Sequence, residues 1–190
     1  TGIAENTLVL FFSDNGANRN GLNGALRGHK GSVWEGGHRV PAIAWWPGTV
    51  AAGRTTSVTA ITLDVMPTLI ELAGARLPEG HLLDGRSLVA VLTGDKTTLR
   101  RPRKRTLFWQ FGKRAAVRRE DWKLVVGQLP DVAVGLYDLR KDLGEQKNLV
   151  AAEPRMVKQL QAALEAWRAD VAHDMTPQPR AGKKNRVPGP

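Results

Sequence analysis

The stretch Thr7-Leu8-Val9-Leu10-Phe11-Phe12 is continuously apolar or β-favouring, and Ser13-Asp14-Asn15-Gly16 follows it directly. Such a run predicts a strand covered on both faces, as in the parallel sheets of α/β proteins. Ligands bind at the carboxyl ends of strands in open α/β sheets, so Asp14 and Asn15 are placed to direct oxygen atoms into a crevice. Because this strand begins almost at the first residue, we expect the flanking strands to come from other sequence and the chain to be a fragment.

A second candidate site segment follows in the glycine-rich stretch Arg27-Gly28-His29-Lys30-Gly31-Ser32-Val33-Trp34-Glu35-Gly36-Gly37-His38-Arg39. Glycines let the backbone approach a ligand closely, and the Lys30 ammonium can meet an anionic oxygen as a point charge. The oxygen donors of Asp14 and Asn15 suit Ca²⁺ or Mg²⁺ better than zinc. Together the two segments predict half of a site for a metal and an anion.

Plainer interpretations of the same residues stay open. Ser13–Gly16 is also a typical turn sequence, and most lysines are solvated surface cations. Glu35 can orient Lys30 or cap a turn, with Arg39 as its ion-pair partner. His29, His38 and Trp34 are candidates for contact with a sugar or aryl ring, although both histidines can equally be hydrogen-bonded loop residues.

The composition allows one domain, or one domain with a small partner, in 190 residues that are 42% hydrophobic. Lys and Arg number 28 against 18 Asp and Glu, a net charge of +10 that favours polyanionic partners. We interpret most of this charge, concentrated in 100–105, 113–119 and 180–186, as a solubilising face. There is no cysteine, which leaves the redox compartment undecided. No apolar run approaches the roughly 20 residues of a membrane span.

Three regions are predicted along the chain. Residues 1–98 contain the first strand, a second strand within 40–46 whose Pro41 limits it to an edge or a strand start, a helix from Asp64 to Gly74 and a short segment at 87–92. Residues 99–176 contain four short strands, at 106–111, 115–118, 122–126 and 135–139, and a helix from Pro154 with an apolar face that can cover the strands. Residues 177–190 form a basic tail that we expect to be flexible.

The order of these motifs resembles the sulfatase family of the alkaline phosphatase superfamily, most closely the arylsulfatase and N-acetylgalactosamine-6-sulfatase type. The resemblance continues beyond Arg39 through Asp64-Val65-Met66-Pro67-Thr68-Leu69, Leu83-Asp84-Gly85-Arg86-Ser87-Leu88, Asp121-Trp122-Lys123-Leu124 and Leu136-Tyr137-Asp138-Leu139. It covers about residues 6–172 and corresponds to the C-terminal part of such an enzyme. The implied fold is α/β: the C-terminal part of an alkaline-phosphatase-like sandwich, followed by a small α+β subdomain.

The resemblance implies that Asp14 and Asn15 are two ligands of one active-site Ca²⁺ and that Lys30 contacts a sulfate ester. Sulfatases use a formylglycine nucleophile made in a Cys/Ser-x-Pro-x-Arg motif, and this sequence contains no such motif. We therefore expect the intact enzyme to be a sulfuric ester hydrolase and the isolated 190 residues to be inactive. The implied substrate is a sulfated small molecule or glycan, not nucleic acid, and the implied location is periplasmic or secreted. The oligomeric state is not predicted.

Two rival functions remain open at this point. A phosphodiesterase or phosphonate hydrolase of the same superfamily is the nearer one, although related enzymes often place histidine at the position of Asn15, which suits a transition metal. The other is a non-catalytic module whose basic segments bind an acidic polymer, with strongly salt-dependent affinity.

Overall fold

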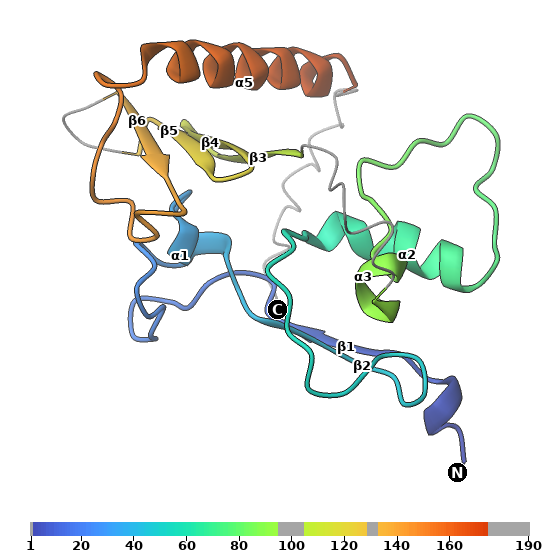
Figure 1. Cartoon of the computed structure of the whole chain (residues 1–190). Coiled ribbons are helices and arrows are strands. Elements are labelled where there is room, and N and C mark those ends of the chain that lie inside the picture. Colours follow the sequence, from blue (N-terminus) through green and yellow to red (C-terminus); the bar gives the residue numbers. More distant parts are fainter. Residues whose placement is uncertain (1, 95–104, 129–132, 175–190) are drawn as a thin grey trace, which may run out of the picture.

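Two separate antiparallel sheets organise the computed structural model, which describes residues 2–94, 105–128 and 133–174 (Figure 1). The first sheet contains β1 and β2, and the second has the strand order β3-β4-β5-β6. In chain order the elements are η1 (Ala4–Asn6), β1 (Val9–Phe12), α1 (Glu35–His38), β2 (Ala42–Trp45), η2 (Thr62–Asp64), α2 (Val65–Leu72), α3 (Val89–Thr93), β3 (Thr106–Phe111), β4 (Arg114–Arg119), β5 (Trp122–Val126), β6 (Val134–Asp138) and α5 (Pro154–Asp174).

The first sheet is antiparallel, whereas the apolar run led us to expect a strand of a parallel sheet flanked by strands from other sequence. β1 pairs with β2 in antiparallel register, from Val9 opposite Trp45 to Phe12 opposite Ala42. Among the described residues no third strand joins this pair, and its apolar side chains stay accessible, with Phe11 71% and Ile43 61% exposed. β2 begins immediately after Pro41, as predicted.

The second sheet is the predicted antiparallel meander, with strand bounds within one residue of those expected. Two-residue turns connect β3 to β4 and β4 to β5, because Phe111 pairs with Arg114 and Arg119 pairs with Trp122. Gly112 and Glu120 have φ of 60° and 56° in these turns, the backbone conformation that tight hairpins require.

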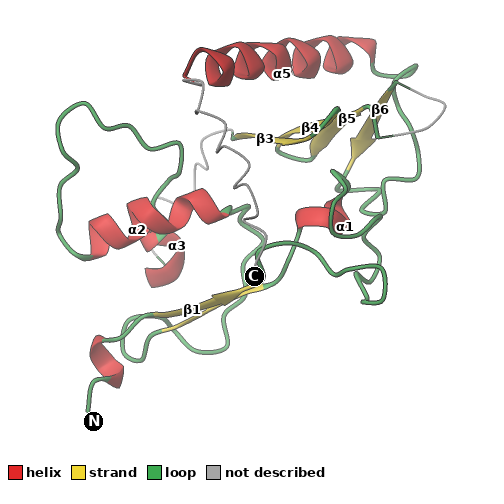
Figure 2. Cartoon of the chain, turned by 180° about the vertical axis from the view of Figure 1, so that it is seen from behind, coloured by secondary structure: helices red, strands yellow, loops and turns green. Residues whose placement is uncertain are grey.

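The two faces of this second sheet are covered by different parts of the chain, as Figures 1 and 2 show from opposite sides. Leu160 and Leu164 of α5 pack on one face against a cluster of strand residues, namely Ala115, Val117, Leu124 and Leu136. Val33 and Trp34 pack on the other face against Ala116, Val125, Tyr137 and Leu139. The glycine-rich stretch that carries Lys30 therefore rests on the second sheet, which must fold for that stretch to be held in place.

Asp64 organises the region around α2 in a way that its sequence position did not predict. It precedes α2 as expected of an N-cap, but its carboxylate makes no cap hydrogen bond to that helix. It accepts two hydrogen bonds of 2.6 Å from Arg105 and one each of 2.8 Å from the backbone N–H of Ile61 and of Arg86. Burial acts to raise the pKa of Asp64, but Arg105 and these backbone donors outweigh it, and the pKa is lowered.

We expect Asp64→Asn to lower the free energy of unfolding by about 2 kcal/mol at pH 7, because it removes a charge-assisted pair from a buried position. The folded-state pKa lies below the unfolded value of 3.8, so this stabilisation is present above pH 3.8 and is lost as the pH falls through the folded-state value. Denaturant unfolding between pH 3 and 7 measures the effect. Asp84→Asn, at an exposed position, is the control, and a wild-type advantage that did not shrink in acid would contradict the prediction.

Three of the basic residues that we expected on a solubilising face are structural instead. Arg105 binds Asp64, Arg118 binds Glu35, and Arg114 donates a 2.9 Å hydrogen bond to the carbonyl of Gly31. The basic runs at 100–104 and 180–186 lie outside the described residues. Within the described ranges, no helix combines the length and hydrophobicity required to span a membrane.

Candidate functional site

The loop after β1 holds the two predicted metal ligands. Asp14 is exposed and Asn15 is half-buried, directly beyond the end of β1 at Phe12. The Ser13 hydroxyl donates a 2.8 Å hydrogen bond to the carbonyl of Asn15 and thereby shapes the turn. The turn and the site interpretations of this sequence are thus compatible, because the turn leaves the Asp14 side chain accessible.

A backbone contact joins this loop to the stretch that carries Lys30. Gly16 N donates a 3.0 Å hydrogen bond to the carbonyl of Gly37, and Lys30 N donates one of 2.9 Å to the carbonyl of Ala17. Gly16 lies so close to α1 that a Cβ atom there would collide with the carbonyl oxygen of Gly36. The structure therefore brings the main chains of the two predicted site segments together, and convergence of their side chains on one ligand stays a prediction.

Lys30 is exposed at the start of a tight turn. Ser32 closes this turn, with its N–H and its hydroxyl donating bonds of 3.0 and 2.8 Å to the carbonyl of His29. His29 Nδ1 lies 2.9 Å from the carbonyl of Lys30, to which it donates. The Lys30 ammonium thus extends from a fixed backbone into solvent, where an anionic group can reach it.

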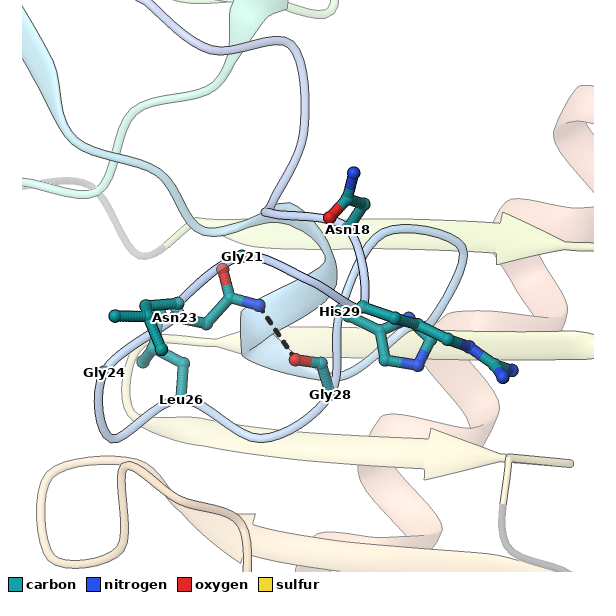
Figure 3. Close-up of a pocket in the computed structure, with 9 residues that line it drawn as sticks. Asn18, Gly21, Asn23, Gly24, Leu26, Gly28 and His29 are labelled. Atoms are coloured by element: carbon teal, nitrogen blue, oxygen red, sulfur yellow. Dashed lines mark hydrogen bonds between the residues drawn. The ribbon is translucent and has the colours of Figure 1, made fainter.

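An open pocket of about 280 Å³ lies in the loop between the two segments (Figure 3). Asn23 shapes its wall by accepting a 3.0 Å bond from Ala17 N and donating one of 2.9 Å to the carbonyl of Gly28. His29, one of the predicted substrate contacts, lies on the lining with Asn18, Arg19, Gly21, Leu22, Gly24 and Leu26. The pocket is open to solvent, and its lining combines apolar surface with the amide side chains of Asn18 and Asn23 and the guanidinium of Arg19.

The end of the Lys30 stretch is anchored by a buried charge network around Glu35. The Glu35 carboxylate is fully buried and accepts from Lys123 at 2.9 Å, Arg118 at 3.2 Å, His38 at 3.3 Å and Arg39 at 3.4 Å. The structure shows neither of the roles predicted for Glu35, which were to orient Lys30 or to cap a turn. The predicted ion pair between Glu35 and Arg39 is present. Burial acts to raise the pKa of Glu35, but His38 and Lys123 outweigh it and hold the pKa far below its usual range.

His38 and Trp34 occupy packed positions rather than the pocket. His38 Nε2 faces Glu35, its ring stacks on Trp109 with centroids 4.2 Å apart, and burial lowers its pKa, which keeps the ring neutral at pH 7. Trp34 is only 5% exposed; it packs edge-on against Tyr137 and lies 4.0 Å beneath the guanidinium of Arg27. In this structure both serve to hold the Lys30 stretch on the second sheet, and neither gains support as a substrate contact.

Two residues of this network were missed from the sequence, Lys123 of β5 and Glu145. Lys123 Nζ lies 2.9 Å from a carboxylate oxygen of Glu35 and 2.9 Å from one of Glu145, and all three side chains are fully buried. Burial raises the pKa of Glu145, and the Lys123 ammonium opposes that rise. The available signal was a lysine inside the otherwise apolar strand Trp122–Val126, whose central residues are buried.

The donor chemistry fits a hard cation only in part. Asp14 and Asn15 supply oxygen, which Ca²⁺ prefers, but Ca²⁺ takes six to eight oxygen ligands. In the part of the chain that the structure describes, no three His, Cys, Asp or Glu side chains are grouped to hold a metal ion. These two residues can therefore contribute to a site and cannot complete one.

Comparison with known proteins agrees with the motifs. Residues 1–75 match the family model described as Sulfatase, and a sulfatase of Formosa agariphila is 38% identical over 170 residues, which is 80% of this chain and 30% of that protein. The chain belongs to the sulfatase family. Human arylsulfatase A is 45% identical over 113 residues, covering 57% of this sulfatase chain and 21% of the human protein. The chain thus spans about a third or less of the curated relatives that it matches.

Solved structures match the sulfatase chain over most of its length and confirm the alkaline-phosphatase-like α/β fold. The structure of Ps i-CgsB is 29% identical and superposes with a TM-score of 0.76, covering 86% of this chain and 37% of that one. The phosphonate monoester hydrolase of Agrobacterium radiobacter is 27% identical with a TM-score of 0.58, covering 90% of this chain and 36% of that one. The partition into regions 1–98, 99–176 and 177–190 stays a prediction.

Proposed function

We propose that the whole protein hydrolyses sulfate esters and that this chain supplies the part of the active site that binds the sulfate group. The observation that carries the proposal is the pair of backbone hydrogen bonds from Gly16 to Gly37 and from Lys30 to Ala17. They bring the main chain of the Asp14–Asn15 turn beside the main chain that carries the exposed Lys30, in a chain of the sulfatase family. Lys30 binds one sulfuryl oxygen and balances its charge, which in a fixed geometry is commonly a large catalytic contribution.

Asp14 and Asn15 are proposed as two ligands of one Ca²⁺, with the remaining ligands supplied by residues outside this chain. The ion would polarise the sulfate group when bound. The nucleophile, a formylglycine by family, would also come from outside these residues, so the 190 residues alone are expected to be inactive. Location in the periplasm or outside the cell is proposed on the same family grounds.

The proposed substrate class is a sulfated glycan or a smaller sulfate ester. Two observations support it: Ps i-CgsB has been solved in complex with k-i-k-neocarrahexaose, and the open pocket beside Lys30 is lined by Arg19, Asn18 and His29. Amide, imidazole and guanidinium groups bind sugar hydroxyls and further anionic groups through hydrogen bonds. We assign the pocket to the part of the substrate that leaves after hydrolysis.

The second candidate is a phosphonate or phosphate ester hydrolase, which the match to the Agrobacterium radiobacter enzyme favours. The carboxamide of Asn15 separates the two, because an oxygen ligand suits Ca²⁺ whereas an imidazole there suits a transition metal. A polyanion-binding module is less favoured, because Arg105, Arg114 and Arg118 are used inside the fold.

The metal preference is the experiment that tests the proposed function. The full-length protein is stripped with a chelator and titrated with Ca²⁺, Mn²⁺ or Zn²⁺, with an aryl sulfate and an aryl phosphonate as substrates. We expect Ca²⁺-supported hydrolysis of the sulfate, and we expect Asp14→Asn to weaken Ca²⁺ binding at least tenfold, or about 1.4 kcal/mol. Asp84→Asn is the matched control at an exposed position. A requirement for Mn²⁺ or Zn²⁺ with preference for the phosphonate would instead establish the second candidate.

A further inference from the structure

Both ends of the loop 27–35, which carries Lys30, are held by one residue from a distant part of the chain. Arg27 Nη1 donates a 2.6 Å hydrogen bond to the main-chain carbonyl of Glu145, and Glu35 N donates one of 2.7 Å to its carboxylate. Lys30 lies between these two attachment points. Glu145 is fully buried, so both of its acceptor groups are shielded from bulk water.

The backbone of Glu145 is itself fixed in an uncommon conformation. Its φ is 52°, in the left-handed region that residues with a side chain seldom adopt. Asp142 stabilises the surrounding turn, because its carboxylate accepts 2.8 Å bonds from the N–H groups of Gln146 and Lys147 and its carbonyl accepts one of 3.2 Å from Glu145. Such a conformation is energetically unfavourable for a residue with a side chain and persists only where the surroundings maintain it.

The charges around Glu145 connect this clamp to the second sheet. Lys123 of β5 lies 2.9 Å from the Glu145 carboxylate and 2.9 Å from that of Glu35. One carboxylate oxygen of Glu145 thus faces Lys123 while the other accepts from Glu35 N. From Glu35 the path continues through α1 to Gly37, whose carbonyl accepts the bond from Gly16 beside Asn15. The second sheet therefore connects to both proposed site segments.

We propose that Glu145 is a positioning residue, which sets the place of the Lys30 ammonium by clamping the loop 27–35 at both ends. This inference rests on the proposed function, since it concerns how Lys30 meets the sulfate group. Glu145 touches neither substrate nor metal in this arrangement and acts through Lys30. A displacement of about 1 Å at a catalytic group can lower the rate by as much as 100-fold.

A double-mutant cycle separates positioning from general stabilisation. In the full-length protein, Glu145→Gln leaves one acceptor oxygen for the two donors Lys123 and Glu35 N, which weakens the clamp at Glu35, and it is expected to lower kcat for aryl sulfate hydrolysis about tenfold. In a Lys30→Ala background the same change should lower kcat less than twofold, because a misplaced ammonium no longer matters once it is absent. A role in stability alone would give the same loss in both backgrounds.

Glu120→Gln is the matched control, because Glu120 also has a positive φ, of 56°, but lies exposed on the turn between β4 and β5. Should Glu145→Gln fail to fold, Arg27→Gln repeats the cycle from the other end of the loop and must show the same dependence on Lys30. Equal losses in both backgrounds, or no loss, would overturn the inference while leaving sulfate hydrolysis intact. A wild-type protein without sulfatase activity would instead overturn the proposed function.

Discussion

Replacing Lys30 with alanine is expected to lower kcat for sulfate ester hydrolysis by roughly 100- to 1,000-fold in the full-length protein, the loss typical of one fixed donor at a developing negative charge. The side chain is exposed and makes no ion pair among those found in the described residues. The fold therefore does not depend on its charge. We expect the unfolding transition of the variant to match that of the wild type.

Lys158→Ala is the control for the Lys30 variant. Lys158 is exposed on α5, which packs on the opposite face of the second sheet from the Lys30 stretch, so its loss changes net charge equally without touching the site. Steady-state kinetics with an aryl sulfate under saturating Ca²⁺ provides the measurement. Comparable rates for wild type and Lys30→Ala would remove Lys30 from the proposed sulfate site.

Replacing Lys123 with methionine is expected to lower the free energy of unfolding by about 3–5 kcal/mol, the cost of removing one partner from a buried ion pair. Lys123 has no exposed surface, and its ammonium is 2.9 Å from carboxylates of both Glu35 and Glu145. Methionine fills most of the volume. Without the ammonium, however, the buried carboxylates of Glu35 and Glu145 repel each other. We also expect faster amide hydrogen exchange in residues 28–38, because the ion pair between Lys123 and Glu35 holds that stretch on the second sheet.

Denaturant unfolding of the full-length protein measures the Lys123 effect, with Lys158→Met as the exposed control, where a change within about 0.5 kcal/mol is expected. Adding Glu145→Gln to Lys123→Met should restore part of the loss, because it removes the charge of Glu145, whose ion pair among those found in the described residues is with Lys123. A Lys123→Met loss below about 1 kcal/mol, the range of a surface pair, would show that the network contributes little to stability.

The second sheet could be predicted from the sequence because its signals are local. Turn residues at 112 and at 120–121 separate short β-favouring runs, and α5 shows its apolar face through residues such as Leu160 and Leu164. The start of α2 at Val65 could also be predicted, because its signals are local as well. The direction of the first sheet went against expectation, because an apolar run indicates that a strand is covered but not which strand pairs with it or in which direction.

The sequence motifs name residues for the candidate site but do not indicate the contacts that support them. Asp14, Asn15 and Lys30 stand in recognisable motifs, whereas the bond from Glu35 to Glu145 joins positions separated by 110 residues. No local pattern encodes such a pair. Lys123 within β5 and Glu35 between apolar residues and glycines were the only traces, since a charge in a buried element requires an opposite charge nearby.

The contact between Gly16 and Gly36 has a further consequence for how specificity can diverge. Because main-chain atoms meet there, this contact between the Asp14–Asn15 turn and the Lys30 stretch needs no side chain of the intervening loop, in which, among the described residues, the Asn23 amide alone is bonded to both segments. Substitutions at Asn18, Arg19 or Leu22 are therefore expected to change the pocket lining while the main-chain contact between the two segments is kept. The side chains that line the pocket can in this way vary while the main-chain contact that joins the two segments stays the same.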